Sequence, residues 1–310
     1  MIKYIIKRLL MLIPVVLGVT ILIFTLMYFT PGDPAVIILG GNASEEQLEA
    51  KREELRLNDG YLHNLGEYMK NVFFKLDFGR SYLNNSSVSE AIFSRFPRTC
   101  IIAFFSVLLS ISFGIPLGIT SAVNQYSWKD HFCMVAALVG VSMPGFWVAL
   151  MLVLLFSLKL GILPPSGIGH IQNYIMPCVA CCLGGMATTA RQTRSSMLEV
   201  IRSDYIITAR AKGQSERKVI YRHALRNALI PIITEAGTSF GLMLGGALVI
   251  ETVFSIPGLG TYMCTAISNR DYPAIQGSVI FLSIVFGIVM MLVDLVYAYV
   301  DPRIKSQYSS

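Results

Sequence analysis

The sequence predicts an all-α integral membrane protein with six transmembrane helices and a small helical insertion outside the membrane after the first span. Of its 310 residues, 54% are hydrophobic and only 14% are charged, whereas soluble proteins of this size carry about a quarter charged residues. Six apolar runs approach or exceed the length of about 20 residues that crosses a bilayer as a helix. These runs cover residues 9–29, 99–123, 132–158, 173–190, 231–254 and 278–300.

The first span is predicted to be retained with its N-terminus in the cytoplasm. Lys3, Lys7 and Arg8 precede the apolar run, and positive charges favour the cytoplasmic side. A secretory signal would have a shorter apolar core and a small-residue cleavage site. Here the run ends in Thr30-Pro31-Gly32-Asp33-Pro34, which predicts an outer turn.

Residues 30–98 are predicted to form a helical insertion on the outer face. Ser44 and Gln47 have the spacing of a capping box ahead of a charged helix, and Asn58-Asp59-Gly60 should end that helix. A second helix is indicated by apolar residues at helical spacing. They are Leu62, Leu65, Met69, Val72, Phe73 and Leu76. The insertion could serve as a landing surface, a lid or a structural cover, and the sequence leaves these roles open.

The remaining spans follow from the loops between them. Pro144-Gly145 predicts a kink in the third span. The two short outer loops carry only Lys159 and Arg270 as basic residues, which supports six spans with both termini cytoplasmic. The expected division is 1–29 for the N-terminal segment and first span, 30–98 for the insertion, 99–300 for a five-helix core that includes the loop 191–230, and 301–310 for a cytoplasmic tail.

The loop 191–230 holds nine Lys or Arg against three acidic residues, and the net charge of the chain is +6. The basicity is therefore local, and no nucleic-acid-binding motif accompanies it. Asp204 is predicted to cap a short helix over 205–212, and Gly213 to end it in a left-handed conformation. Ser215 is predicted to cap an amphipathic helix that runs to Pro231.

The loop sequence TARAKGQSERKVIYRHALRNALIP, residues 208–231, resembles the cytoplasmic coupling loop of binding-protein-dependent ABC importers. It is most similar to the permease subunits of dipeptide, oligopeptide and nickel importers. The broader importer pattern has Glu-Ala-Ala before the glycine and an earlier proline, whereas this chain has Ile207-Thr208-Ala209. Further similar segments occur in order along the chain. They are 30–34, 76–81, 142–157 with its MPGFW core, 251–260 and 301–303.

The resemblance implies the type I ABC importer permease fold, with this loop docking on a separate ATPase subunit. The residues expected to form the ATPase-coupling loop are Asp204, Tyr205, Ala209, Arg210, Ala211, Lys212, Gly213, Arg222 and His223. Ala209 and Gly213 are expected to face the ATPase, because small residues allow close approach. This chain has no GxxxxGK[ST] phosphate loop, so ATP and Mg²⁺ would bind the partner, and we expect no cofactor on this chain.

The expected partners are a second homologous permease, two ATPase subunits or domains, and an extracytoplasmic solute-binding protein. The resemblance places the complex in the cytoplasmic membrane of a bacterium or archaeon. It also implies alternating access for di- or oligopeptides, each permease forming half of the path. Import of nickel or a metal chelate by a permease of the same family is the alternative.

Three carboxylates fall at or within predicted spans: Glu235, Glu251 and Asp294. An intramembrane charge is a functional hypothesis by default, although a structural role is favoured for all three. Glu251 lies beside a turn with which it could form an outer gate, together with Pro257, Gly258 and Gly260. Small or weakly polar residues are expected to line the path, without a tight midway site. They are Ser142, Thr188, Thr189, Thr238 and Ser239.

A membrane enzyme and a six-span channel are the competing classes. The chain lacks the HExxH and GxSxG motifs, so we expect no catalytic residue. It shows no filter-like repeat or arginine ladder. Cys178, Cys181 and Cys182 lie in an apolar run and are interpreted as packing residues, so no metal site is expected. A disulfide between Cys100 and Cys264 is left open.

Overall fold

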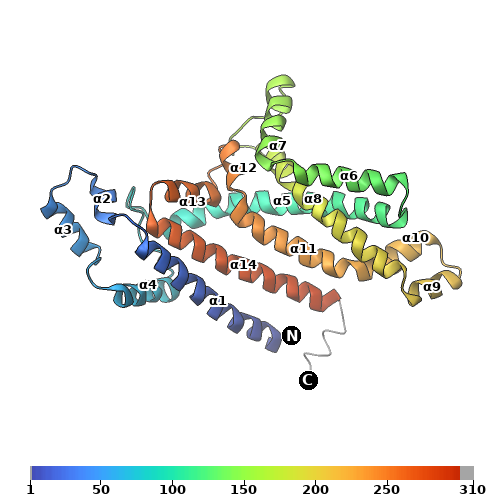
Figure 1. Cartoon of the computed structure of the whole chain (residues 1–310), viewed down its shortest axis with the longest axis horizontal. Helices are drawn as coiled ribbons and strands as arrows, with labels where there is room; N and C mark the ends of the chain where they lie inside the picture. The colour runs from blue at the N-terminus through green and yellow to red at the C-terminus, as the bar shows by residue number, and fades with distance from the viewer. Residues whose placement is uncertain (1, 301–310) are drawn as a thin grey trace. The chain divides into compact units, whose positions relative to one another are not determined.

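The computed structural model describes residues 2–300, and nearly all of the regular structure in this part is helical (Figure 1). An isolated antiparallel bridge joins Arg80 and Ser87. The predicted all-α fold is confirmed. The elements are α1 (Ile2–Phe29), α2 (Pro34–Leu39), α3 (Glu45–Glu54), α4 (Tyr61–Lys75), α5 (Val88–Val123), α6 (Trp128–Ser142), α7 (Gly145–Leu152), the π-helical η1 (Val153–Lys159), α8 (Gln172–Ile201), α9 (Asp204–Ala211), α10 (Glu216–Lys218), the π-helical η2 (Val219–Ala224), α11 (Leu225–Gly246), α12 (Leu248–Val253), α13 (Leu259–Ser268) and α14 (Tyr272–Val300).

Four described helices are long and apolar enough to cross a membrane, and a bent pair makes a fifth candidate. The four cover Ile5–Phe29, Val88–Val123, Glu216–Gly245 and Tyr272–Val296. The predicted run 173–190 is the first part of α8, which is not among these candidates. This helix does not end at residue 190, because it continues as one helix to Ile201 in the basic loop.

The predicted third span is broken rather than kinked. Helices α6 and α7 meet at a bend of 94° (Figure 1). Met143, which precedes Pro144, is extended, with φ −79° and ψ 124°. A residue before proline is driven out of the helical region by the proline ring, so the break falls where the sequence requires it.

Pro231 does not end a helix, contrary to the prediction. It lies inside α11, which continues from α10 and η2 without interruption. Proline removes one backbone hydrogen bond from a helix. Ala228 and Ile232 on either side are buried, and α11 packs along α8. This packing holds the helix together across the missing bond.

The described chain divides into two compact units. The first unit holds residues 2–5, 99–256 and 288–300 of the described chain. It has one hydrophobic core around Met176 and Phe254 and another around Met197 and Ile206. The second holds 6–98 and 257–287 and has a core around Phe78, Ile92 and Phe281.

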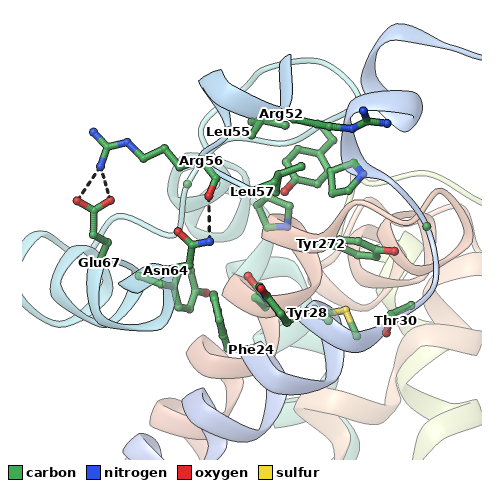
Figure 2. Close-up of a pocket in the computed structure, with 18 of the residues that line it drawn as sticks. Phe24, Tyr28, Thr30, Arg52, Leu55, Arg56, Leu57, Asn64, Glu67 and Tyr272 are labelled. Atoms are coloured by element: carbon green, nitrogen blue, oxygen red, sulfur yellow. Dashed lines mark hydrogen bonds and ion pairs between the residues drawn. The ribbon is translucent and has the colours of Figure 1, made fainter. Parts of the chain in front are cut away.

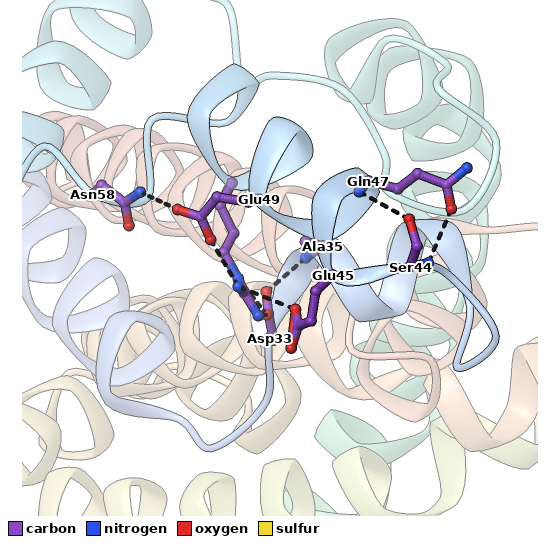
Figure 3. A network of polar contacts seen from close by, with 8 residues as sticks. Asp33, Ala35, Ser44, Glu45, Gln47, Glu49 and Asn58 are labelled. Atoms are coloured by element: carbon purple, nitrogen blue, oxygen red, sulfur yellow. Dashed lines mark hydrogen bonds and ion pairs between the residues drawn. The ribbon is translucent and has the colours of Figure 1, made fainter.

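The insertion in the second unit begins with two capped helices (Figure 3). Ser44 and Gln47 form the predicted capping box of α3. Asp33 caps α2 through the amide of Ala35 at 2.9 Å, and its other oxygen accepts from Arg52 at 2.8 Å. Arg52 also donates to Glu49 at 2.9 Å, which lowers the pKa of that carboxyl. The predicted outer turn is therefore tied to α3 by ion pairs.

Helix α4 forms as predicted, but its apolar stripe is only partly covered. Val72 is buried, whereas Leu62 and Leu76 are exposed, because only part of α4 packs against the core of its unit. A cavity of about 650 Å³ opens between the insertion and aromatic residues such as Phe24 and Tyr272 (Figure 2). At its rim Arg56 binds both oxygens of Glu67.

The segment 76–81 is anchored within the second unit. Phe78 is buried beneath α14, where a Cβ on Gly277 would lie 2.7 Å from the Phe78 Cβ. The buried carboxylate of Asp271 accepts from the hydroxyl of Ser81 and, at 3.0 Å, from the amide of Tyr82. This segment therefore has a structural role that its sequence alone does not reveal.

Candidate functional site

The short helix of the basic loop is α9, and it follows α8 directly. It begins at Asp204 with Ser203 as its N-cap, one residue earlier than predicted. Gly213 follows it with φ +73°, the left-handed conformation that glycine adopts without steric cost. The predicted glycine stop is therefore present. Arg222 and His223 lie farther along, in η2.

Helix α9 is seated on the first unit by one buried side chain. Ile206 is fully buried in a cluster with Met197, Val219 and Ile119. Ala209 is partly buried and packs against the same cluster. Ala209 therefore lies on the packed side of the helix, and its contact with an ATPase stays a prediction.

The exposed side of α9 carries a mixed apolar and basic surface. Ile207 is 56% exposed, and Tyr205 is also exposed. They are accompanied by Arg210, Ala211 and Lys212 on the same segment, all exposed. The exposed residues of α9 and the turn after it therefore combine apolar and basic side chains.

Two polar contacts fix α9 to the following helices. The amide of Asn227 donates to the hydroxyl of Tyr205 at 2.6 Å. Arg210 donates to Glu216 at 2.7 Å, across the Gly213 turn, and this pairing raises the pKa of the arginine. The predicted loop residues thus form one ordered element.

A partly buried ion pair braces α8, the helix that leads into α9, against α6. Arg194 on α8 donates two hydrogen bonds to Asp130 on α6, from Nε at 2.9 Å and from Nη2 at 2.8 Å. Asp130 is only 3% exposed, and it also accepts from the hydroxyl of Ser121 and the amide of Tyr126. The sequence analysis missed this pair, because 64 residues separate its members.

The two glycines of α5 let it approach α8 closely. A Cβ on Gly114 would lie 2.8 Å from the Thr189 Cβ, and one on Gly118 would lie 2.5 Å from the Thr193 Cβ. Small residues four apart are a common device for such contacts in membranes. Helix α5 is continuous here, so the glycines serve packing.

The predicted path-lining residues lie in four different settings. Thr188 and Ser239 line a cavity of about 430 Å³ in the first unit. Thr189 is 3% exposed and packs on α5, so it is not available to a solute. Ser142 lines a separate apolar hollow beside Pro144 and Trp147. Thr238 donates to the backbone of its own helix and is not among the residues lining the 430 Å³ cavity.

Glu235 also lines the 430 Å³ cavity. Its Oε1 accepts a hydrogen bond from Ser239 at 3.1 Å. The opposite wall comes from α8 and includes Thr188, Gly184 and Cys181. The cavity therefore brings an acidic side chain together with hydroxyl groups, in a place where the sequence predicted only weakly polar residues.

The residues predicted for an outer gate have separate surroundings. Glu251 is fully buried and accepts from Thr99 Oγ1 at 2.6 Å. Its backbone carbonyl accepts from the amide of Ile256 at 2.8 Å, so Glu251 supports a turn of the first unit.

In the second unit, Gly258 is the N-cap of α13, and Gly260 is buried in its first turn. The carbonyl of Pro257 accepts from Arg98 at 3.0 Å. All six cysteines, including Cys100 and Cys264, are free thiols.

The comparisons cover nearly the whole chain. Residues 114–306 match the family described as binding-protein-dependent transport system inner membrane component, and residues 1–103 match the N-terminal region of such membrane components. The dipeptide transport system permease protein DppB of Alkalihalophilus pseudofirmus is 42% identical, covering 98% of this chain and 100% of the relative. The glutathione transport system permease protein GsiC of Escherichia coli K12 is 39% identical, covering 98% and 99%.

The fold has a counterpart among solved structures. An inward-facing structure of the MetNI methionine ABC transporter matches with a TM-score of 0.58 at 16% identity. The match covers 68% of this chain and 96% of that chain. At this identity the likeness concerns the fold.

Proposed function

Because the chain belongs to the family of binding-protein-dependent transport system inner membrane components, we propose that it forms half of the path through which an ATP-driven importer takes up di- or oligopeptides. The chain is a permease subunit of the peptide importer type and not itself an enzyme. Its family depends on a binding protein and an ATPase, and it is a multi-pass protein of the inner membrane.

The observation that carries the proposed mechanism is the seating of α9. A loop that only set membrane topology would not need a buried anchor such as Ile206 or the brace between Asp130 and Arg194. These contacts transmit a displacement of α9 to α6 and α8, which line the 430 Å³ cavity. We take α9 to be the element through which ATP hydrolysis on a partner reopens the path.

The partner residues on α9 follow from its exposed side. Ile207 and the Gly213 turn would contact the ATPase, with Arg210 and Lys212 at the margin. Asp204, Tyr205, Ala211, Arg222 and His223 complete the proposed coupling region. Ala209 supports the helix from its packed side.

The proposed topology has six crossings with both termini in the cytoplasm. The five candidate spans supply five crossings. The first part of α8 supplies the sixth, since it packs against both α6 and α11 and leads into the basic loop. Residues 30–98 would then lie outside as an insertion, 99–300 would form the core, and 301–310 would follow as a cytoplasmic tail.

A second, homologous permease would complete the path. The 430 Å³ cavity in this chain is lined by residues of α6, α7, α8, α11 and the segment after it, and we take it to be this chain's half of the route. Two ATPase subunits or domains would bind ATP and Mg²⁺ beneath the permease pair. A solute-binding protein would deliver cargo at the outer face, where Glu251, Pro257, Gly258 and Gly260 are proposed to form the gate.

The test of this arrangement is the mass of the intact complex purified with its endogenous partners. We expect two different permeases, two ATPase subunits or domains and the binding protein. A stable and active assembly that contains this permease alone would contradict the proposal. Uptake of free nickel ion in preference to any peptide would favour the metal-importing branch of the family instead.

A further inference from the structure

We propose that the carboxylate of Glu235 binds the ammonium group of a peptide inside the translocation path. This inference rests on the proposed function, because it takes the 430 Å³ cavity to be part of the route. The ammonium is that of a lysine side chain in the cargo, which a carboxylate can bind through a charge-assisted hydrogen bond.

The continuous helix places Glu235 deep within its span. The sequence predicts a span over 231–254, in which Glu235 would lie near the cytoplasmic end. The structure extends the candidate span over Glu216–Gly245. At 1.5 Å per residue, Glu235 lies about 15 Å along the helix from Gly245, the end of the candidate span. A carboxylate within a candidate span is a functional hypothesis by default.

The cavity around Glu235 offers acceptors for hydrogen bonds and no competing cation. Its lining holds no lysine, arginine or histidine among the residues that the structure places there. Ser239 supplies one hydrogen bond to Oε1, whereas a carboxylate can accept about four. Thr188 on the facing wall donates to the carbonyl of Gly184 at 3.0 Å, so its oxygen remains an acceptor. An ammonium brings three donors and complements this set.

The size of the cavity suits a short peptide segment. Its volume of about 430 Å³ lies within the range of roughly 300–1,000 Å³ that holds small ligands. Most of the lining consists of small or apolar residues, including Gly140, Gly184 and Ala180. Such walls do not select side chains, so Glu235 would orient the cargo by its charge and leave the rest of its sequence free.

The test uses the complete importer in proteoliposomes with two tripeptides, Ala-Lys-Ala and Ala-Glu-Ala. Each peptide is presented on saturating binding protein, so that the preference of the binding protein is the same for every permease variant. The quantity measured is the ratio of the two initial uptake rates. Glu235→Gln removes the charge at nearly constant volume, and Glu235→Asp keeps it.

We expect Glu235→Gln to lower the lysine-to-glutamate uptake ratio about tenfold, which corresponds to about 1.4 kcal/mol, and Glu235→Asp to restore most of the ratio. Glu199→Gln is the matched control, because Glu199 is exposed on the part of α8 beyond the cavity and should leave the ratio unchanged. If Glu235→Gln does not assemble, Thr188→Lys places a cation in the same cavity and should lower the ratio likewise.

Three results would overturn the inference. Equal losses for both peptides would show that Glu235 supports the fold only. An unchanged uptake ratio in Glu235→Gln would show that the charge of Glu235 does not contribute to cargo recognition. If Glu235→Gln does not assemble, an unchanged ratio in Thr188→Lys would show the same. Uptake of neither peptide by the wild-type complex would refute the proposed function itself, and the inference would fall with it.

Discussion

Breaking the ion pair between Asp130 and Arg194 should both destabilise the permease and weaken its coupling to ATP hydrolysis. Arg194→Met keeps an unbranched apolar stem but removes the guanidinium, which leaves the carboxylate of Asp130, 3% exposed, without its charged partner. Removing one member of a buried pair costs about 3–5 kcal/mol. The Arg194 side chain is 27% exposed, so water can partly replace it, and we expect about 3 kcal/mol.

The double variant separates the ion pair from the other contacts of each residue. In Asp130→Asn/Arg194→Met no buried charge remains; the single carboxamide oxygen can still accept from the Tyr126 amide, and the carboxamide NH2 can donate to the hydroxyl oxygen of Ser121. We therefore expect the double variant to be more stable than Arg194→Met alone, with a coupling energy of at least about 1 kcal/mol. The assay is thermal or denaturant unfolding of the purified complex, accompanied by the ratio of ATP hydrolysed to peptide imported.

Strict additivity of the two single losses would refute this reasoning, since it would mean that the residues do not interact energetically. A destabilised variant that retains the wild-type ratio of ATP to peptide would also contradict part of it. That outcome would mean that the ion pair between Asp130 and Arg194 stabilises the fold but takes no part in coupling α9 to the path.

Three further predictions concern single positions. Gly213→Asn, whose side chain tolerates a left-handed backbone, should leave the complex assembled but raise the ATP consumed per peptide; an unchanged ratio would contradict the placement of the turn at the ATPase. Gly118→Val should reduce thermal stability by several kcal/mol, because even its Cβ would lie 2.5 Å from the Thr193 Cβ. Gly18→Ala is the control, because nothing lies within 4 Å of the new Cβ, and it should be neutral or stabilising. If Gly18→Ala and Gly118→Val lose equal thermal stability, the close packing of Gly118 on Thr193 is not the cause. The pKa of Glu49 is lowered in the fold, so the stability that this carboxylate contributes is present above its unfolded pKa and is lost as the pH falls through its folded pKa. Hydrogen exchange in α3 should therefore become faster at acidic pH relative to exchange in α5. If the ratio of the two exchange rates does not change with pH, the Arg52 network does not stabilise α3.

The features that the sequence predicted best are local ones. The capping box of Ser44 and Gln47, the interruption at Pro144-Gly145, which was predicted as a kink, and the left-handed Gly213 each depend on a few neighbouring residues, whose backbone preferences are strong. The capping box is present in the structure, and so is the positive φ of Gly213. The extent of α11 was missed, because the packing of Ala228 and Ile232 outweighs the single bond lost at Pro231.

The site depends on contacts between distant segments, which a single sequence does not reveal. Thr188 and Thr189 are adjacent and alike, yet one lines the cavity and the other packs on Gly114. The pairing of Asp130 with Arg194 likewise becomes visible only when α6 and α8 are placed together. Composition indicates that such spans are buried in lipid or protein, but the direction of each side chain is set by the packing of whole helices.

The most direct test of the central claim is ATP-dependent peptide accumulation in proteoliposomes that contain the complete complex. The chain should be required, together with its partner permease, ATPases and binding protein, for a peptide to accumulate against its gradient. Accumulation should stop when ATP is replaced by an analogue that cannot be hydrolysed. ATP hydrolysis stimulated by the loaded binding protein without any accumulation of peptide would contradict the account.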